Sequence, residues 1–218
     1  MKHERNIVII EPHIDDSLLS CSTRLLSQDF DRIYNICFYT ADDRDILNYK
    51  VKLNNRIIPI VLPLSEIHFK HGETFSLDGF IQGDVFENIT YESIRGQFDS
   101  YELVLTSVFS AVSALYIPCG IYHPHHIIAN KLVSEFIAER FKEKETYIYF
   151  DQPYSFNFPK HFELALSRND IHDFHSKKNI ESVSASYLKS KMLECFDPCH
   201  LTDDELNIDC VILYKRQR

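Results

Sequence analysis

A histidine and two adjacent aspartates follow the first apolar run of this 218-residue chain, in the stretch EPHIDDSLLSC at residues 11–21. The side chains concerned are His13, Asp15 and Asp16. A neutral imidazole and a carboxylate three residues apart on a turn can bind one divalent cation. The alternative is that an aspartate caps the helix that follows, since a carboxylate there accepts amide hydrogen bonds and favours the helix dipole. This stretch by itself leaves both interpretations open.

A second group of such residues lies much later in the chain, in CGIYHPHHIIANKL at residues 119–132. His123 and His126 are three residues apart at the start of a strongly amphipathic helix pattern. Both stretches follow predicted strands, and in open α/β sheets ligands bind beyond the carboxyl ends of the strands. His13, Asp16 and His126 would then give three nitrogen and oxygen ligands with one position left for water, as catalytic zinc sites have.

The elements that must position these residues alternate between strands and helices. Strands are expected at residues 7–10, 34–40, 66–69, 103–108, 147–150 and 208–214. Helices are expected at residues 16–28, 44–58, 89–98, 127–141 and 186–196. Such alternation predicts an α/β fold, a Rossmann-like three-layer sandwich with a mostly parallel sheet, and residues 1–218 are expected to form one domain. Residues 70–88 and 152–185 show no strong pattern and are predicted to be long loops, which often border a site.

Charge and composition limit the classes of partner. A formal net charge of -9 argues against nucleic acid or an anionic membrane surface, which attract basic patches. No apolar run approaches the roughly 20 residues of a membrane span. The start of the chain does not resemble a signal peptide and the six cysteines suggest no disulfide framework, so a cytoplasmic protein is expected. Homo-oligomerisation is left open.

The glycine distribution excludes one class of site. No glycine precedes Gly72, so the turn after the first strand cannot be a glycine-rich phosphate cradle. The cysteine cluster CFDPCH at residues 195–200 also lacks the spacing of a metal or haem motif.

The two motifs resemble those of the PIG-L/LmbE-like zinc-dependent N-deacetylases. The family's first motif, (P/A)HPDDE, corresponds here to PHIDDS at residues 12–17, and its second, HPDH or HxDH, to HPHH at residues 123–126. The form IDDSLLSC resembles a subgroup whose motif reads PHLDDAALS, and YIYFDQPYSF at residues 147–156 resembles that subgroup's Y-x-D-x-PY stretch. The order and spacing of elements agree over about residues 6–156.

The resemblance implies a zinc-dependent hydrolase that removes an acetyl group from an N-acetylated amino sugar or glycoconjugate. It makes His13, Asp16 and His126 the ligands of Zn2+, or of another divalent metal such as Fe2+. It makes Asp15 the general base, and His123, in its protonated form, the group that stabilises the oxyanion or protonates the leaving amine. Zinc lowers the pKa of its bound water to about 7, which suits amide hydrolysis at neutral pH.

Two residues depart from the family pattern. Ser17 replaces the glutamate of the commonest first motif, and His125 replaces an aspartate that can orient the catalytic histidine. Asp151 and Asp173 are candidates to replace that aspartate as the partner of His123. Because of these departures, two alternative functions stay open. One is a hydrolase of another small amide, and the other is a metal-containing sugar-binding protein with weakened catalysis.

Three residues are candidates for substrate binding. Arg44 lies with Arg56 at the ends of the second predicted helix, where the family often keeps a substrate-contacting arginine, although a solvated helix face is the alternative. Tyr122 and Tyr154 are candidates to line a sugar pocket by ring stacking. The remaining histidines of the later part of the chain are expected in surface loops: His161, His172 and His175.

Overall fold

One mixed sheet organises the part of the chain that the computed structural model describes, which comprises residues 5–39, 44–68, 75–82, 89–152, 154, 158–172, 180–184 and 210–216. Within these residues the sheet has seven strands in the order β3-β2-β1-β4-β5-β7-β6. The parallel strands are β1 (Asn6–His13), β2 (Arg32–Tyr39), β3 (Ile57–Val61), β4 (Ala114–Pro118) and β5 (Glu145–Tyr149). The antiparallel strands are β6 (Ile180–Ser184) and β7 (Cys210–Lys215). The predicted mostly parallel α/β sheet is confirmed.

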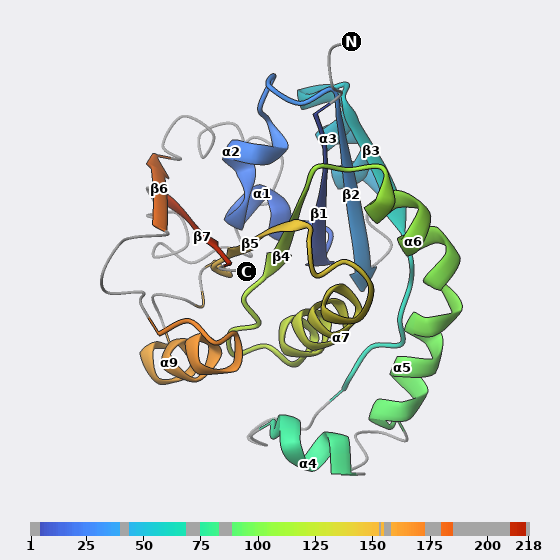
Figure 1. The fold of residues 1–218 in the computed structure, drawn as a ribbon, viewed down its shortest axis with the longest axis vertical. Helices are drawn as coiled ribbons and strands as arrows, with labels where there is room; N and C mark the ends of the chain where they lie inside the picture. The colour runs from blue at the N-terminus through green and yellow to red at the C-terminus, as the bar shows by residue number, and fades with distance from the viewer. Residues whose placement is uncertain are drawn as a thin grey trace.

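Helices cover both faces of this sheet (Figure 1). The long helix α7 (Pro124–Arg140) lies on one face together with α5 (Tyr91–Ser100) and α6 (Glu102–Ser110), and α1 (Asp16–Ser20) and α2 (Ser22–Leu25) lie on the other. The remaining helices are α3 (Arg44–Leu53), α4 (Leu77–Gln82) and α9 (Pro159–Arg168). The helix predicted at residues 16–28 is therefore split into two short helices, and those predicted at 89–98 and 127–141 are present with shifted ends.

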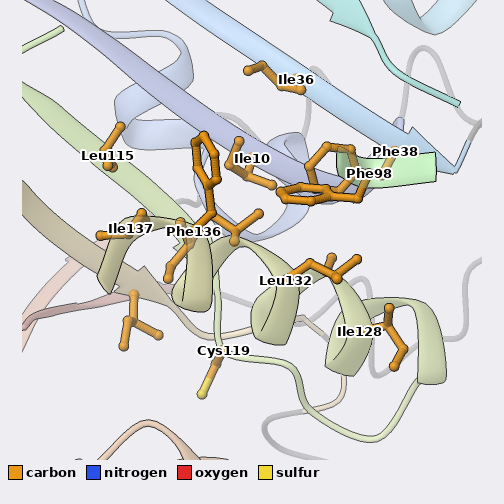
Figure 2. Packing of buried hydrophobic residues seen from close by; sticks show 14 of the residues in the cluster. Ile10, Ile36, Phe38, Phe98, Leu115, Cys119, Ile128, Leu132, Phe136 and Ile137 are labelled. Carbon is orange, nitrogen blue, oxygen red and sulfur yellow. The ribbon is translucent and has the colours of Figure 1, made fainter. Parts of the chain in front are cut away.

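Strand β1 builds a core on each of its faces because successive side chains of a strand point to opposite sides. Val8 and Ile10 belong to the apolar cluster under α5, α6 and α7, whereas Ile7 and Ile9 belong to the cluster under α1 and α2. All four side chains are fully buried. Figure 2 shows the first cluster, in which Phe136 and neighbouring residues of α7 pack against the sheet. Burial on both faces explains why this run does not alternate between apolar and polar residues.

Residues 103–108, predicted to be a strand, instead form most of helix α6. Leu105 and Phe109 are fully buried at a spacing of four residues, while Leu103 is 84% exposed. The apolar run therefore supplies both exposed and buried positions of one helix. Its length and its residue types also suit a strand, so they did not identify the helix. The strand that precedes the histidine cluster is β4, which the sequence reading did not identify.

The third strand was also misplaced, since β3 comprises residues 57–61 and residues 66–68 are extended without strand pairing. Proline is uncommon within strands, so Pro59 makes this strand difficult to recognise from the sequence. It is tolerated here because β3 is an edge strand of the sheet. The two predicted loops contain structure as well, because 70–88 includes α4 and 152–185 includes α9 and β6. The predicted helix 186–196 and the cluster at 195–200 lie outside the described residues.

This topology brings the two histidine motifs together. Strands β1 and β4 are parallel neighbours, with Ile7 opposite Ala114 and Ile9 opposite Tyr116. Their carboxyl ends therefore meet at the same edge of the sheet. The turn from β1 into α1 and the turn from β4 into α7 follow directly from these ends.

Candidate metal centre

Three side chains from the two turns converge with the spacing of metal ligands. His13 Nδ1 lies 3.3 Å from His126 Nε2, and Asp16 Oδ1 lies 3.3 Å from the same His126 nitrogen. Asp16 Oδ2 lies 3.4 Å from His13 Nδ1. Two ligands bound at about 2.05 Å to a tetrahedral zinc ion are about 3.3 Å apart. Both contacts of His126 Nε2 have this length, whereas His13 contacts the second carboxylate oxygen of Asp16, and one possible ligand atom from each of the three residues lies within 4.8 Å of the other two. The donor set therefore fits a zinc ion or a similar divalent metal.

The first turn holds Asp16 through its own backbone. Asp16 Oδ2 accepts a hydrogen bond of 2.6 Å from the backbone amide of His13, which fixes the carboxylate beside the imidazole. Asp15 occupies the N-cap position of α1, but its side chain makes no capping hydrogen bond. The interpretation of the two aspartates as helix caps is therefore not borne out for Asp15, and the Asp16 carboxylate is turned toward the histidines.

The second turn is shaped by two residues with left-handed backbone. Gly120 has φ 77° and Tyr122 has φ 61°. A Cβ on Gly120 would lie 3.0 Å from Cβ of Asn130 and 3.2 Å from the carbonyl oxygen of His126, so the close approach of the turn to α7 requires glycine there. Asn130 also donates a 2.7 Å hydrogen bond to the carbonyl of Pro118. These contacts fix the start of α7 against the end of β4.

Asp151 orients the ring of His126 from behind. Its Oδ1 lies 2.8 Å from His126 Nδ1, and its Oδ2 accepts a 2.9 Å hydrogen bond from the amide of Ile121. The carboxylate accepts a hydrogen bond from Nδ1–H, so Nε2 of the same ring faces His13 and Asp16. A carboxylate behind a ligand histidine is the usual support of a protein metal site. Asp151 thus partners His126 and not His123, and Asp173 lies outside the described residues.

Burial and charge act in opposite directions on the two most buried ligands. Burial raises the pKa of the Asp16 carboxyl, but His126 and His13 outweigh it and lower this pKa to about 2. Burial lowers the pKa of His126, but Asp16 and Asp151 raise it to about 9. A proton and a metal cation compete for the same His126 lone pair, because a coordinating imidazole must be unprotonated on the ligating nitrogen.

Asp15 and His123 lie beside the ligand group. Burial and the neighbouring Asp16 raise the pKa of Asp15, which favours a carboxyl able to take up a proton. The His123 ring lies 5.0 Å from that of His13 and 5.6 Å from that of His126, measured between centroids. Burial, with the charges of His126 and His13, lowers the pKa of His123 to about 3, so this ring is neutral at pH 7. The expectation of a protonated His123 is therefore replaced by a neutral imidazole.

A second group, His13, His123 and His125, also has ligand atoms within 4.8 Å of one another. Both ring nitrogens of His125 are, however, engaged within the protein. Nε2 accepts a 2.8 Å hydrogen bond from the amide of Ile67, and Nδ1 lies 2.8 Å from His13 Nε2. The His125 ring also stacks on Tyr39 at 4.0 Å and 10°. These contacts make His125 a support for the His13 ring.

A buried ion pair lies on the other side of the first turn. The ammonium of Lys50 contacts both carboxylate oxygens of Glu11 at 2.7 Å, Ser17 Oγ at 2.9 Å and Asn35 Oδ1 at 3.0 Å. Both Lys50 and Glu11 are fully buried. Burial raises the pKa of Glu11 to about 7 against the opposing effect of Lys50. The backbone amide of Ser17 donates a hydrogen bond to the Glu11 carboxylate. A carboxylate therefore lies next to position 17, although it belongs to Glu11 and not to residue 17 itself.

The proposed substrate residues have different positions. The Tyr154 ring lies 5.3 Å from that of His126 and 6.2 Å from that of His123, and the Tyr122 ring lies 5.7 Å from that of Tyr154. Arg56 donates to the carbonyls of Phe30 and Gln28 before β2, at the sheet edge away from the metal ligands, so it is not part of this site. The side chain of Arg44 lies outside the described residues.

Two of the three later histidines can be placed. His161 lies on α9 and not in a loop, with its ring 5.2 Å from that of Tyr122. His172 is exposed and pairs with Asp170 at 2.7 Å, as a surface residue would. His175 lies outside the described residues.

The sequence reading missed the residues that support the ligands from a distance. Glu11 lies on β1, Lys50 on α3 and Ile67 in the segment after β3, and no local spacing links them. One signal was present, since Glu11 is an acid within a run whose neighbours are apolar, and a buried acid needs a partner.

Comparison with solved structures places the chain among α/β proteins of the deacetylase fold. The structure of a deacetylase–teicoplanin complex from the teicoplanin biosynthesis pathway superposes with a TM-score of 0.52 at 13% identity, covering 98% of this chain and 100% of that chain. The zinc-inhibited form of teicoplanin deacetylase Orf2 gives 0.49 at 13% identity, covering 96% and 97%. No family model and no curated protein sequence matches the chain. The likeness at this identity establishes the fold. None of the described helices is long and apolar enough to cross a membrane.

Proposed function

We propose that this protein is a metal-dependent amide hydrolase of the PIG-L/LmbE-like N-deacetylase type, which removes an acetyl group from an N-acetylated amino sugar or glycoconjugate. The observation that carries the proposal is the convergence of His13, Asp16 and His126 at the spacing of zinc ligands, with Asp151 behind His126. The substrate class follows from the motif resemblance. A deacetylase that shares the fold is solved in complex with teicoplanin, so glycoconjugates are among the substrates to test.

Each residue has a role that suits its surroundings. Zinc, or another divalent metal such as Fe2+, would be held by His13, Asp16 and His126 and would supply a water of pKa about 7 and a Lewis acid for the amide oxygen. Asp15 accepts the proton of the attacking water, because its carboxylate is not committed to capping α1. It then carries that proton toward the leaving nitrogen.

His123 acts in this scheme as a neutral hydrogen-bond donor. Its Nδ1 accepts a 3.3 Å hydrogen bond from the amide of His125, so its ring proton lies on Nε2. That N–H donates to the oxygen on which negative charge develops during attack on the amide, the type of interaction that contributes most in acyl transfer. This role needs no carboxylate partner, and the aspartate that His125 replaces is therefore not required for it.

The test is acetate release from a panel of N-acetylated amino sugars and their glycosides by zinc-loaded and chelator-treated protein. We expect release that depends on the metal and that falls about 10²- to 10⁴-fold in Asp15→Asn with the metal content unchanged. Asp29→Asn is the matched control, because Asp29 is exposed and its carboxylate accepts a hydrogen bond from Ser27 Oγ in the same turn.

Two outcomes would redirect the proposal. Turnover of other small amides without turnover of acetyl sugars would keep the chemistry and change the substrate. One bound metal per chain with no turnover of any amide would instead favour a metal-containing sugar-binding protein.

A further inference from the structure

A pocket of about 520 Å³ lies beside the metal centre and has no role in the chemistry described so far. Its walls come from residues 75–78 at the start of α4, from the first turn of α7, and from α9. A volume of this size is typical of small-molecule sites and is far larger than an acetyl group needs.

The lining of the pocket is apolar on its walls and polar at its edge. Phe75, Leu77, Tyr122, Ile127 and Leu164 supply the apolar surface. Leu164 is 61% exposed and Tyr122 is 40% exposed, so both present apolar surface that an occupant of the pocket could cover. An apolar occupant would remove this surface from water.

The charges at the edge compensate each other. Asp78 and Arg168 both line the pocket, and Arg168 also donates a hydrogen bond to the carbonyl of Gly120. The ionisable groups of the lining are one carboxylate, one guanidinium and the imidazole of His161, so the two full charges oppose each other. An uncharged occupant therefore suits it better than an anion or a cation.

Three residues that line the pocket are chain neighbours of the candidate active-site histidines. Tyr122 and Pro124, which line it, directly flank His123 in the chain, and Ile127 directly follows His126. The Tyr122 ring is held by stacking on Phe158 at 3.7 Å and 4°.

Tyr154 links the pocket wall to the histidines. Its ring lies 5.7 Å from the ring of Tyr122 and 6.2 Å from the ring of His123. Two successive ring contacts thus connect the pocket wall to the candidate active site.

We propose that this pocket binds an uncharged aromatic or alkyl substituent of the substrate, so that the enzyme prefers acetylated amino sugars that carry a hydrophobic aglycone. The inference rests on the proposed function for the position of the amide. The shape and lining of the pocket stand independently of it.

The test compares the methyl and phenyl β-glycosides of N-acetylglucosamine, which differ only in the substituent, using the zinc-loaded full chain. We expect kcat/KM to be about tenfold or more higher for the phenyl glycoside, mostly through a lower KM, because the ring is buried against apolar walls. In Leu164→Asp the ratio between the two substrates should fall to about one. Leu103→Asp, at an 84% exposed position on α6 outside the pocket, should keep the wild-type ratio.

Isothermal titration with phenyl β-glucoside, which has no amide, separates failure of the pocket from failure of the proposed reaction. Binding by the wild type and loss of binding in Leu164→Asp would support the pocket even if neither acetyl sugar is hydrolysed. Equal kcat/KM for the two glycosides, a preference that survives Leu164→Asp, or no binding of the amide-free probe by the wild type would overturn it.

Discussion

Two buried clusters of charged residues share the turn after β1, and they differ in how their charges are balanced. In the ion-pair cluster, Lys50 faces a carboxylate, a hydroxyl and an amide oxygen, so every donor of its ammonium has an acceptor. In the candidate metal-ligand cluster, ring nitrogens of His13 and His126 and the carboxylate oxygens of Asp16 lie 3.3–3.4 Å from one another. The first cluster contains its own cation. The second brings together a donor set that could hold a divalent cation.

The difference indicates how a structural network can be told from a ligand site. Buried charges are stable only when paired, so a network that satisfies itself points to fold stability. A network of acceptors that converge on one point indicates binding of a cation. Mutations in the two clusters should therefore differ in what they change, metal binding in one and unfolding in the other.

The largest expected effect is from Asp16→Ala. Removal of one of three ligands should abolish stoichiometric zinc binding and lower the proposed activity by at least about 10³-fold, since no metal-bound water forms. Metal content measured by atomic emission after gel filtration tests this directly. Asp99→Ala, at an exposed position of α5, should bind metal like the wild type. A variant without Asp16 that still holds one zinc per chain would mean that the ligand group is wrongly assigned.

The next effect is on stability, from Lys50→Met. This change leaves Glu11 buried without its partner, and loss of one member of a buried pair costs about 3–5 kcal/mol. Urea unfolding should show that loss, whereas Lys52→Met on an exposed position of the same helix should lie within about 0.5 kcal/mol of the wild type.

The double variant Glu11→Leu with Lys50→Met tests whether the Lys50 effect comes from the unpaired carboxylate. It should recover a large part of the lost free energy of unfolding, because the unpaired charge is gone. If Lys50→Met left stability intact and instead removed metal binding, the two clusters would have to be treated as one.

The smallest effect is expected from Asp151→Asn. The asparagine amide can still contact the His126 ring, but it lacks the negative charge of the carboxylate. Zinc affinity should therefore fall about 10- to 100-fold, while one equivalent of zinc still binds at saturation. Competition with a chromophoric chelator measures the change. An affinity equal to the wild type would show that the turn alone orients His126.

The proximity of His13, Asp16 and His126 could be predicted because these residues lie in two short motifs that each follow an apolar run. The parallel order of the strands explains why the two motifs meet, since parallel neighbours bring the turns after them to one edge of the sheet. It was harder to predict whether a segment forms a strand or a helix. The run at residues 103–108 has strand-forming residues, yet it lies on a helix whose buried residues are Leu105 and Phe109. The periodicity of those two residues was the better guide than the propensity of their neighbours.

The supporting contacts could not be predicted for a different reason. Lys50 reaches Glu11 from another element, and Ile67 reaches His125 through a backbone amide, which carries no sequence signal at all. Asp151 was identified as a candidate but was assigned to the wrong histidine, because spacing along the chain does not reveal which ring a carboxylate faces.

The contact between His125 and Ile67 has a consequence for tautomers. A neutral imidazole carries one ring proton, and the Ile67 amide at Nε2 places that of His125 on Nδ1, facing His13 Nε2. A metal on His13 Nδ1 would put the His13 proton on Nε2 and oblige His125 to accept there. The His125 proton would then lie on Nε2, opposite the Ile67 N–H, with two donors face to face. The Ile67 amide and a metal on His13 Nδ1 therefore favour opposite tautomers of His125.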